Sequence, residues 1–227
     1  MGRKSRRYTE SLQVADRSEA YPLNEAIEKL KAMKPARFDE TVELHVQLGI
    51  DARHSDQQVR GSISLPHGTG QERTVAVFAD GAGADAAREA GADIVGADDL
   101  IERVTEGFTG FDVALATPDM MSRIGRLGRF LGPRGLMPSP KSGTVRSDIG
   151  EAVQEFKAGK VEFRNDSGGN IHVAVGKISF DTSALAENVL ALIEQLQRMK
   201  PTAAKGRYLR KVFVTSTMNP AVPVEIP

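Results

Sequence analysis

Apolar residues recur with two different periods along the first third of the chain. A helix is predicted before Pro35 because five apolar residues there have helical spacing, namely Leu23, Ala26, Ile27, Leu30 and Met33. Between Val42 and Ile50 the period changes to two, with polar residues such as Glu43 and His45 in the alternate positions. This predicts a long strand with one buried and one exposed face. A similar alternation over residues 59–65 predicts a second strand.

The pattern changes between about residues 70 and 160, where short apolar segments alternate with helical ones. Strands are predicted at residues 75–78, 93–95 and 111–116. Helices are predicted in the alanine-rich segment that ends at Gly91, at residues 98–104, and from Ile149 to Ala158, where Asp148 and Glu151 have capping-box spacing and Gly159 follows. This rhythm is typical of βαβ units with a parallel sheet, so the predicted fold class is α/β.

The first pattern returns after Lys160. Residues 161–164 and 171–175 alternate on either side of a turn at 165–170, which predicts a hairpin. A helix and a last strand at 212–216 follow; the apolar stripe of the helix is Leu185, Val189, Leu192, Ile193, Leu196 and Met199. Because both ends of the chain share a pattern that the middle lacks, we expect a discontinuous domain from residues 1–67 and 160–227, and an inserted domain from residues 68–159, joined at a hinge.

Charge clustering separates this chain from an ordinary neutral protein. Thirty basic residues balance thirty acidic ones over 227 residues. Yet three windows contain no carboxylate and several cations each: residues 3–7, 123–146 and 198–211. Such clustering is the electrostatic pattern of a protein that binds a polyanion, and it favours RNA or DNA over a merely solvated face.

The window at 123–146 is also rich in glycine and proline, so it is not expected to form one continuous helix or strand. It is expected to present backbone amides and guanidinium groups to an anion. We take four of its cations as a second basic surface: Arg126, Arg129, Arg134 and Lys141. The alternative is that this stretch packs between the two domains.

Other residues argue against catalysis. The chain has no cysteine, which excludes disulfides and thiolate zinc sites and fits a reducing cytosol, and its four histidines lack metal-ligand spacing. No apolar run is long enough to span a bilayer, so no membrane association is expected. The turn at residues 80–83 could seat a phosphate, but it lacks the rest of a dinucleotide or P-loop motif. We therefore expect no enzyme activity, cofactor or metal. The rival hypotheses are a nucleotide-binding α/β enzyme centred on residues 80–85 and a protein-interaction module that uses the stripe of residues 185–199.

Short polar side chains gather at three predicted strand ends, in residues 37–43, 163–166 and 215–220. Hydroxyl, amide and carboxylate groups in such positions suit hydrogen bonds to ribose 2′-hydroxyls and base edges. They are also ordinary turn-forming residues.

Several motifs in the same order resemble the bacterial large-subunit ribosomal protein L1 family over nearly the whole chain. The most specific are LGPRGLMP at residues 131–138, KSGTV at 141–145 and FDETVE at 38–43. EFRND at 162–166 and TM at 217–218 add to the match. The resemblance implies a first domain of split β-α-β type, built from both chain ends, and a three-layer Rossmann-like insert.

The resemblance also implies a function. The first domain is expected to bind the stalk region of large-subunit ribosomal RNA, and the protein is expected to contact deacylated tRNA at the exit site. Members often repress translation of their own operon mRNA. We expect a cytoplasmic location on the ribosome and a monomer outside it.

The predicted RNA-binding surface combines the positions that match the family with neighbouring cations. The family positions are Arg37, Phe38, Thr41, Glu43, Asp166, Thr217 and Met218. Arg164 and His172 extend this surface, and Lys205 and Arg207 are candidates for positioning the RNA backbone. Asn219 stands where the family would have glycine. Because Asn tolerates a positive φ better than most residues, we expect the turn to survive this replacement.

Overall fold

The computed structural model describes residues 5–226, so Arg3 and Lys4 of the N-terminal basic window lie outside the described residues. The chain divides into two compact units. Unit 1 comprises Met1–Gly70 and Val161–Pro227, and unit 2 comprises Gln71–Lys160. That each unit folds as an independent domain stays a prediction.

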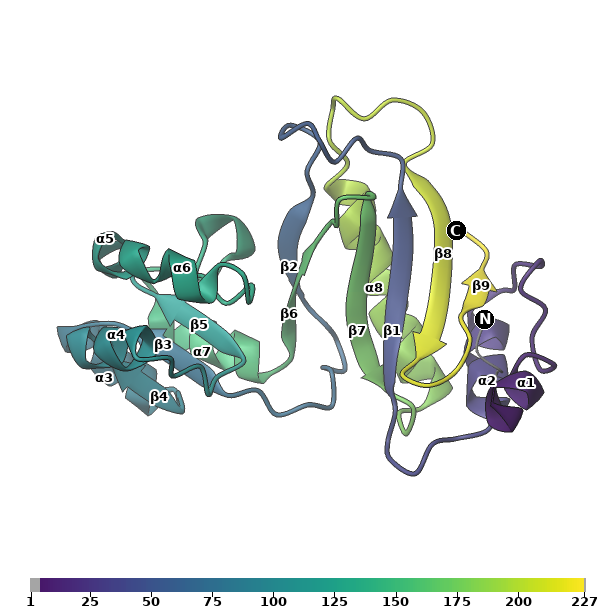
Figure 1. Ribbon diagram of the computed structural model, residues 1–227, viewed down its shortest axis with the longest axis horizontal. Helices are drawn as coiled ribbons and strands as arrows, with labels where there is room; N and C mark the ends of the chain where they lie inside the picture. The colour runs from purple at the N-terminus through teal and green to yellow at the C-terminus, as the bar shows by residue number, and fades with distance from the viewer. Residues whose placement is uncertain (1–4, 227) are drawn as a thin grey trace. The chain divides into compact units, whose positions relative to one another are not determined.

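Unit 1 is built on a four-stranded antiparallel sheet in the order β7-β1-β8-β9 (Figure 1). Its strands are β1 (Thr41–Leu48), β7 (Asn170–Lys177), β8 (Leu209–Ser216) and β9 (Val222–Val224). The predicted strand at 42–50 is confirmed, and burial alternates along β1 as the period of two requires. In the central strand, Glu43 lies opposite Ala174 on β7 and Thr215 on β8.

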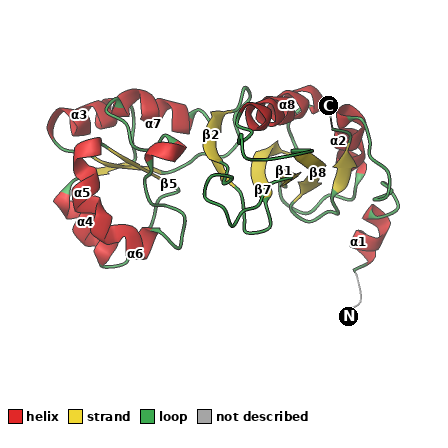
Figure 2. Cartoon of the chain, turned by 90° about the horizontal axis from the view of Figure 1, so that it is seen from above, coloured by secondary structure: helices red, strands yellow, loops and turns green. Residues whose placement is uncertain are grey.

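Two helices, α2 (Leu23–Ala32) and α8 (Thr182–Arg198), cover the apolar face of this sheet (Figure 2). Val42, Leu44 and Val46 pack with the α8 residues Leu192 and Leu196 in one core. The stripe at residues 185–196 is therefore core, and the hypothesis that it forms a protein-interaction surface is wrong. The short helix α1 (Arg6–Ser11) and strand β9 were not predicted.

The predicted hairpin at 161–175 is also wrong. β6 (Lys160–Arg164) pairs with β2 (Arg60–Ser64) in a separate two-stranded sheet, whereas β7 pairs with β1. A single bridge, Asn165 to Ile171, joins the two segments. Two hydrogen bonds hold Asn165, at the end of β6, beside Val59, which precedes β2. The Asn165 Oδ1 accepts from the Val59 backbone amide at 2.7 Å, and the Asn165 backbone amide donates to the Val59 carbonyl at 3.0 Å.

Unit 2 has three layers, a parallel sheet in the order β4-β3-β5 between two helical layers (Figure 2). This confirms the α/β fold class. The strands are β3 (Val75–Phe78), β4 (Ile94–Gly96) and β5 (Val113–Ala116). On one face lie α3 (Gly81–Glu89) and α7 (Ile149–Lys157), and on the other lies α4 (Asp98–Thr105) with residues 118–131. Both faces of β3 are buried, as expected for a parallel strand between helical layers.

Residues 118–131 form one helical run that alternates between 3-10 and α geometry, and the rest of the glycine-rich stretch up to Arg146 contains only one further helical turn. These elements are η1 (Pro118–Met120), α5 (Met121–Ile124), η2 (Gly125–Leu127), α6 (Gly128–Leu131) and η3 (Pro140–Ser142). Ile124, Leu127 and Leu131 are fully buried in unit 2. Gly132 follows α6 in close contact with it, since a Cβ there would lie 2.4 Å from the carbonyl oxygen of Gly128.

Candidate nucleic-acid interface

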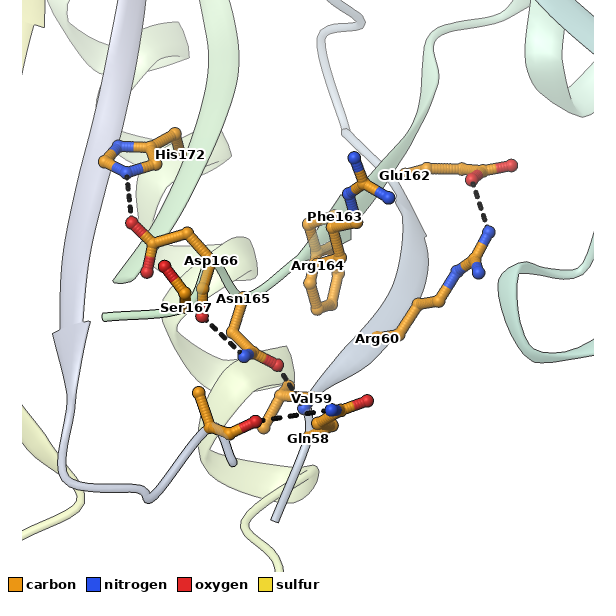
Figure 3. A pocket seen from close by; sticks show the side chains of 11 residues that line it. Gln58, Val59, Arg60, Glu162, Phe163, Arg164, Asn165, Asp166, Ser167 and His172 are labelled. Atoms are coloured by element: carbon orange, nitrogen blue, oxygen red, sulfur yellow. Dashed lines mark hydrogen bonds and ion pairs between the residues drawn. The ribbon is translucent and has the colours of Figure 1, made fainter. Parts of the chain in front are cut away.

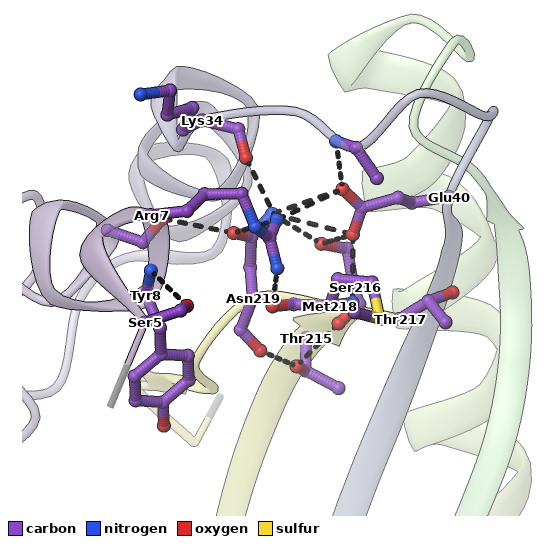
Figure 4. Close-up of polar contacts among 12 residues, drawn as sticks. Ser5, Arg7, Tyr8, Lys34, Glu40, Thr215, Ser216, Thr217, Met218 and Asn219 are labelled. Carbon is purple, nitrogen blue, oxygen red and sulfur yellow. Dashed lines mark hydrogen bonds and ion pairs between the residues drawn. The ribbon is translucent and has the colours of Figure 1, made fainter. Parts of the chain in front are cut away.

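A buried carboxylate organises the end of the sheet where β1 begins and β8 ends. Glu40, directly before β1, is only 1% exposed. Its Oε1 accepts a hydrogen bond from the Ala36 amide at 2.8 Å, and its Oε2 accepts from the Ser216 hydroxyl at 2.7 Å and the Met218 amide at 2.9 Å (Figure 4). Burial raises the pKa of Glu40, but these hydrogen bonds and the positive charge of Arg7 outweigh it and leave the pKa below its ordinary value. An ionised Glu40 therefore holds two separate loops in place.

Asn219 joins helix α1 to the same turn. Its Oδ1 accepts a hydrogen bond from the Ser11 hydroxyl at 3.1 Å, and its Nδ2 donates to the Ser216 hydroxyl at 3.0 Å. Arg7 donates to the Met218 carbonyl at 2.7 Å (Figure 4). Within residues 5–226 every residue with a positive φ is a glycine, so Asn219 does not use the tolerance for a positive φ on which the expectation relied. Asn219 is held by its side chain instead. We call Arg7, Ser11, Glu40, Ser216 and Asn219 the Glu40 cluster.

The Glu40 cluster presents several of the predicted contact residues. The Thr41 amide donates to Thr217 Oγ1 at 3.1 Å, and the Thr217 amide donates to the Thr41 carbonyl at 3.1 Å, so the two strand ends are locked together. Beside them, Phe38 is 54% exposed and Met218 is 48% exposed, and Arg37 is exposed as well. Large apolar side chains left in solvent beside fixed polar groups are suited to contact with unstacked bases.

The face of β1 opposite the helices carries Glu43, His45 and Gln47, all half-buried. His45 lies directly opposite His172 on β7 and Phe213 on β8, so three rings form a row across the sheet. The two histidine Nδ1 atoms are 2.6 Å apart, which requires at least one neutral imidazole, because one must donate and the other accept. Burial lowers the pKa of His45, and His172 lowers it further against the opposing effect of Glu43.

A second carboxylate organises the opposite end of β1, roughly 20 Å from Thr41 at about 3.3 Å per strand residue. Asp166 Oδ1 accepts hydrogen bonds from the Asn170 amide at 2.7 Å and the Gly168 amide at 2.9 Å. The bonds from Asn170, followed by those from Gly168 and His172, hold the pKa of Asp166 below its usual range despite some burial. The turn at 165–170 is therefore fixed by its own side chains.

Arg164, Asp166 and His172 line a groove of about 730 Å³ between residues 52–60 and 162–172 (Figure 3). Arg60, on the opposite wall, lies 3.9 Å from Glu162. Arg164 forms no ion pair within the described residues and is exposed. Asp166 thus lies at the opposite end of β1 from Thr41 and Thr217, and His172 lies opposite His45 in the middle of that strand.

Lys205 and Arg207 lie near the Asp166 end of β1, where the Leu48 amide donates to the Gly169 carbonyl and the Gly49 amide donates to the Tyr208 carbonyl. Both are exposed in the loop that precedes β8, whereas Thr217 follows the end of that strand. The eight residues of β8 separate these cations from the Glu40 cluster.

The cations of the glycine-rich stretch differ in their surroundings. Arg123 is paired with Asp98, and Arg146 is paired with Glu151 and Glu155 at 3.0 and 3.1 Å. In the described part of the chain, none of the four cations of the predicted second basic surface has a carboxylate partner, and all four are exposed; they are Arg126, Arg129, Arg134 and Lys141. Arg134 donates to the Thr109 hydroxyl.

Unit 2 offers little for the rival hypothesis of a nucleotide site. The Asp80 carboxylate accepts a hydrogen bond from the Gly81 amide at 2.8 Å, so a negative group already caps the N-terminus of α3 where a phosphate would bind. Over residues 5–226, no group of three or more His, Cys, Asp or Glu side chains could hold a metal ion. None of the described helices is long and apolar enough to cross a membrane.

Sequence reasoning missed Arg7, Ser11, Glu40, Ser216 and Asn219 as a connected set. Glu40 belongs to the FDETVE motif at residues 38–43, and only its place directly before an alternating strand could have indicated its role. Ser11 and Asn219 are 208 residues apart in sequence, and nothing in the pattern of either segment indicates the other.

The sequence model of the "Ribosomal protein L1p/L10e family" matches residues 30–220. A protein of Kosmotoga olearia named large ribosomal subunit protein uL1 is 56% identical over 225 residues, which cover 99% of this chain and 97% of the relative. Proteins with the same name from Bifidobacterium longum and Thermobifida fusca are 54% and 52% identical, over 99% and 98% of this chain and 98% and 95% of their own lengths.

Proposed function

The chain belongs to the ribosomal protein L1p/L10e family and is a structural constituent of the large ribosomal subunit in the cytoplasm, and from this premise we propose a specific RNA-binding role. Unit 1 binds the stalk region of large-subunit rRNA. The protein assists the movement and release of deacylated tRNA at the exit site, and it represses translation of its own operon mRNA by binding a similar RNA fold.

The observation that supports this proposal most strongly is the Glu40 cluster. Its hydrogen bonds fix the backbone of residues 217–218 before any ligand arrives. Preorganised donors and acceptors lower the ordering cost of binding. Thr41, Glu43 and Thr217 supply the polar groups that read 2′-hydroxyls and base edges, while Phe38 and Met218 supply apolar contact.

Unit 2 has a different role in this proposal. Its unpaired cations, Arg126, Arg129, Arg134 and Lys141, contact the backbone of tRNA or of further rRNA. Replacing Arg126, Arg129 and Arg134 by Ala is expected to lower the salt dependence of RNA binding, measured as the slope of log K against log salt. An unchanged slope would exclude phosphate contacts at this surface.

The decisive test of the function measures binding of the full chain to a stalk-region rRNA fragment and to a control RNA of the same length. The wild type is expected to prefer the stalk fragment. Thr217→Val is expected to weaken that binding at least about tenfold, or ~1.4 kcal/mol. It removes the Thr217 hydroxyl, which accepts from the Thr41 amide and which we propose also bonds to the RNA. The salt slope should change little, since no charge is lost.

Thr202→Val is the matched control, because Thr202 is exposed in the loop before β8. It is expected to bind the stalk fragment like the wild type. Equal and weak binding of the wild type to both RNAs would refute the proposal. Competition between the stalk fragment and the leader of the operon mRNA tests repression: failure of the leader to compete would exclude a shared binding surface.

A further inference from the structure

A basic groove of about 290 Å³ lies at the β8–β9 edge of the unit 1 sheet. Its walls include Arg17, Arg207, Arg210, Lys211, Phe213 and Glu225. Strand β9 contributes Pro223 and Val224 to its lining, with Pro223 opposite Phe213 and Val224 opposite Val212. The Tyr21 amide donates to the Pro223 carbonyl at 3.1 Å, and the Glu225 amide donates to the Tyr21 carbonyl at 2.9 Å. These bonds hold the segment that carries Arg17 along the outer edge of the sheet.

The charge of this groove is not neutralised by the protein. Across residues 5–226, none of the four lining cations, Arg17, Arg207, Arg210 and Lys211, is in an ion pair, and all are exposed. Glu225 is the one carboxylate among the lining residues. Arg207 is oriented by a hydrogen bond from its Nε to the Leu209 carbonyl at 3.1 Å. Four clustered cations around a concave surface create a positive potential that attracts polyanions.

We propose that this groove binds the sugar–phosphate backbone of an RNA strand, as an anchor separate from the Glu40 cluster. Phe213 favours RNA over an acidic protein segment as the ligand, because sites for single-stranded nucleic acid combine a basic groove with aromatic rings. Phe213 is half-buried, lines the groove and also lies opposite His45 in the ring row of the sheet.

The groove and the Glu40 cluster lie at opposite ends of β8. Lys211 and Thr217 are about 20 Å apart at roughly 3.3 Å per strand residue. One RNA ligand that reaches both would therefore be read at one end by fixed polar groups and held at the other through phosphates. This inference rests on the proposed RNA-binding function and adds a second contact surface to it.

The test compares the full-chain variant Arg210→Ala/Lys211→Ala with the control Arg88→Ala/Arg103→Ala. Both variants lose two positive charges, and the control residues are exposed on α3 and α4 of unit 2, outside the three basic windows. Each protein is titrated with the stalk-region fragment and with a poly(U) oligonucleotide over a range of salt concentrations. The groove variant is expected to lower the magnitude of the log–log salt slope by about 1.4 on poly(U), since each phosphate contact with a single strand contributes about 0.7. The control is expected to keep the wild-type slope.

The poly(U) arm separates this proposal from the proposed function. Loss of slope on poly(U) with no specific binding of the wild type to the stalk fragment would support the groove and refute the stalk function. Specific stalk binding with an unchanged slope for the groove variant on both RNAs would overturn the groove alone. Absence of wild-type binding to both RNAs would also overturn it. So would binding of the wild type to poly-glutamate that the groove variant loses to the same extent as its binding to poly(U).

Discussion

Replacing Glu40 by Gln is the sharpest test of how the binding surface is held. The substitution keeps the size of the side chain but removes its charge, and one oxygen becomes an NH2 donor. If the remaining oxygen faces Ser216 and Met218, the new donor faces the Ala36 amide, which now donates at 2.8 Å. The other orientation loses the bond from the Met218 amide at Oε2, whereas the Ser216 hydroxyl can turn to accept from the new NH2 group. Because hydrogen bonds to charged groups contribute about 1.5–3 kcal/mol each, we expect unit 1 to lose about 2–4 kcal/mol of unfolding free energy.

Tyrosine fluorescence reports this loss selectively. The chain has no tryptophan and three tyrosines, Tyr8, Tyr21 and Tyr208, and all three belong to unit 1. Urea unfolding followed by this signal therefore measures unit 1 without a contribution from unit 2. Glu28→Gln, at an exposed position of α2, makes the same change of charge and is expected to stay within about 0.5 kcal/mol of the wild type.

RNA binding gives the functional readout of the same variant. We expect Glu40→Gln to bind the stalk fragment more weakly at a temperature where it is fully folded, because the 217–218 turn loses its anchor. A loss of stability below about 1 kcal/mol would refute the reasoning that Glu40 is an ionised anchor, since a single charged hydrogen bond exceeds that value. Reduced stability with wild-type RNA affinity would show that the turn keeps its geometry without Glu40.

Two further predictions concern the same cluster. Asn219→Gly, which restores the residue expected for the family, should destabilise unit 1 by about 1–2 kcal/mol, because it removes the bonds to Ser11 and Ser216 and frees the backbone. Amide hydrogen exchange in α1 should accelerate. Unchanged exchange there would contradict the role assigned to Asn219. The second concerns acid. The pKa of Glu40 is lowered on folding, so its contribution to stability is present above its unfolded pKa of about 4.3 and is lost as the pH falls through the folded pKa. The wild type should therefore lose more unfolding free energy between pH 7 and pH 3 than Glu40→Gln, and equal losses would show that Glu40 does not titrate with folding.

Much of the fold could be predicted because burial leaves a periodic trace in the sequence. The alternation from Val42 onward required a strand with one buried face, and β1 has that pattern. The stripe from Leu185 to Leu196 required a helix against a core, and α8 has it. Short elements were missed because three apolar residues in β9, or six mostly polar ones in α1, carry too little periodicity.

Strand pairing is the part that periodicity did not determine. Val161 and Phe163 alternate with polar residues and are buried, and this would be equally true whether β6 paired with β7 or with β2. Alternation specifies which face of a strand is buried, but not which strand lies beside it. In the structure, the pairing of β6 with β2 is supported by Asn165, whose side chain and backbone both bind the backbone of Val59, far away in sequence.

The same distinction applies to the candidate site. Single residues such as Phe38, Thr41 and Thr217 could be named from motifs, because a motif is contiguous in sequence. The Glu40 cluster could not be assembled, because it joins α1, the start of β1 and the turn after β8. A substitution such as Asn219 could then be judged only by its backbone freedom, whereas its effect in the structure comes from side-chain bonds to Ser11 and Ser216.

The two carboxylates at the ends of β1 are compatible with the proposed RNA-binding surface although they are acidic. Glu40 and Asp166 each accept several hydrogen bonds from backbone amides of nearby turns, so their charge is compensated within the protein and not aimed at phosphate. They fix the turns that the RNA would meet. Among the described residues, the cations without a carboxylate partner include the four of the β8–β9 groove, the four of the second basic surface on unit 2, and Arg164 in the groove that Asp166 lines. A neutral chain can thereby divide recognition between two kinds of surface: rigid polar turns that select an RNA shape, and unpaired cations that hold its backbone.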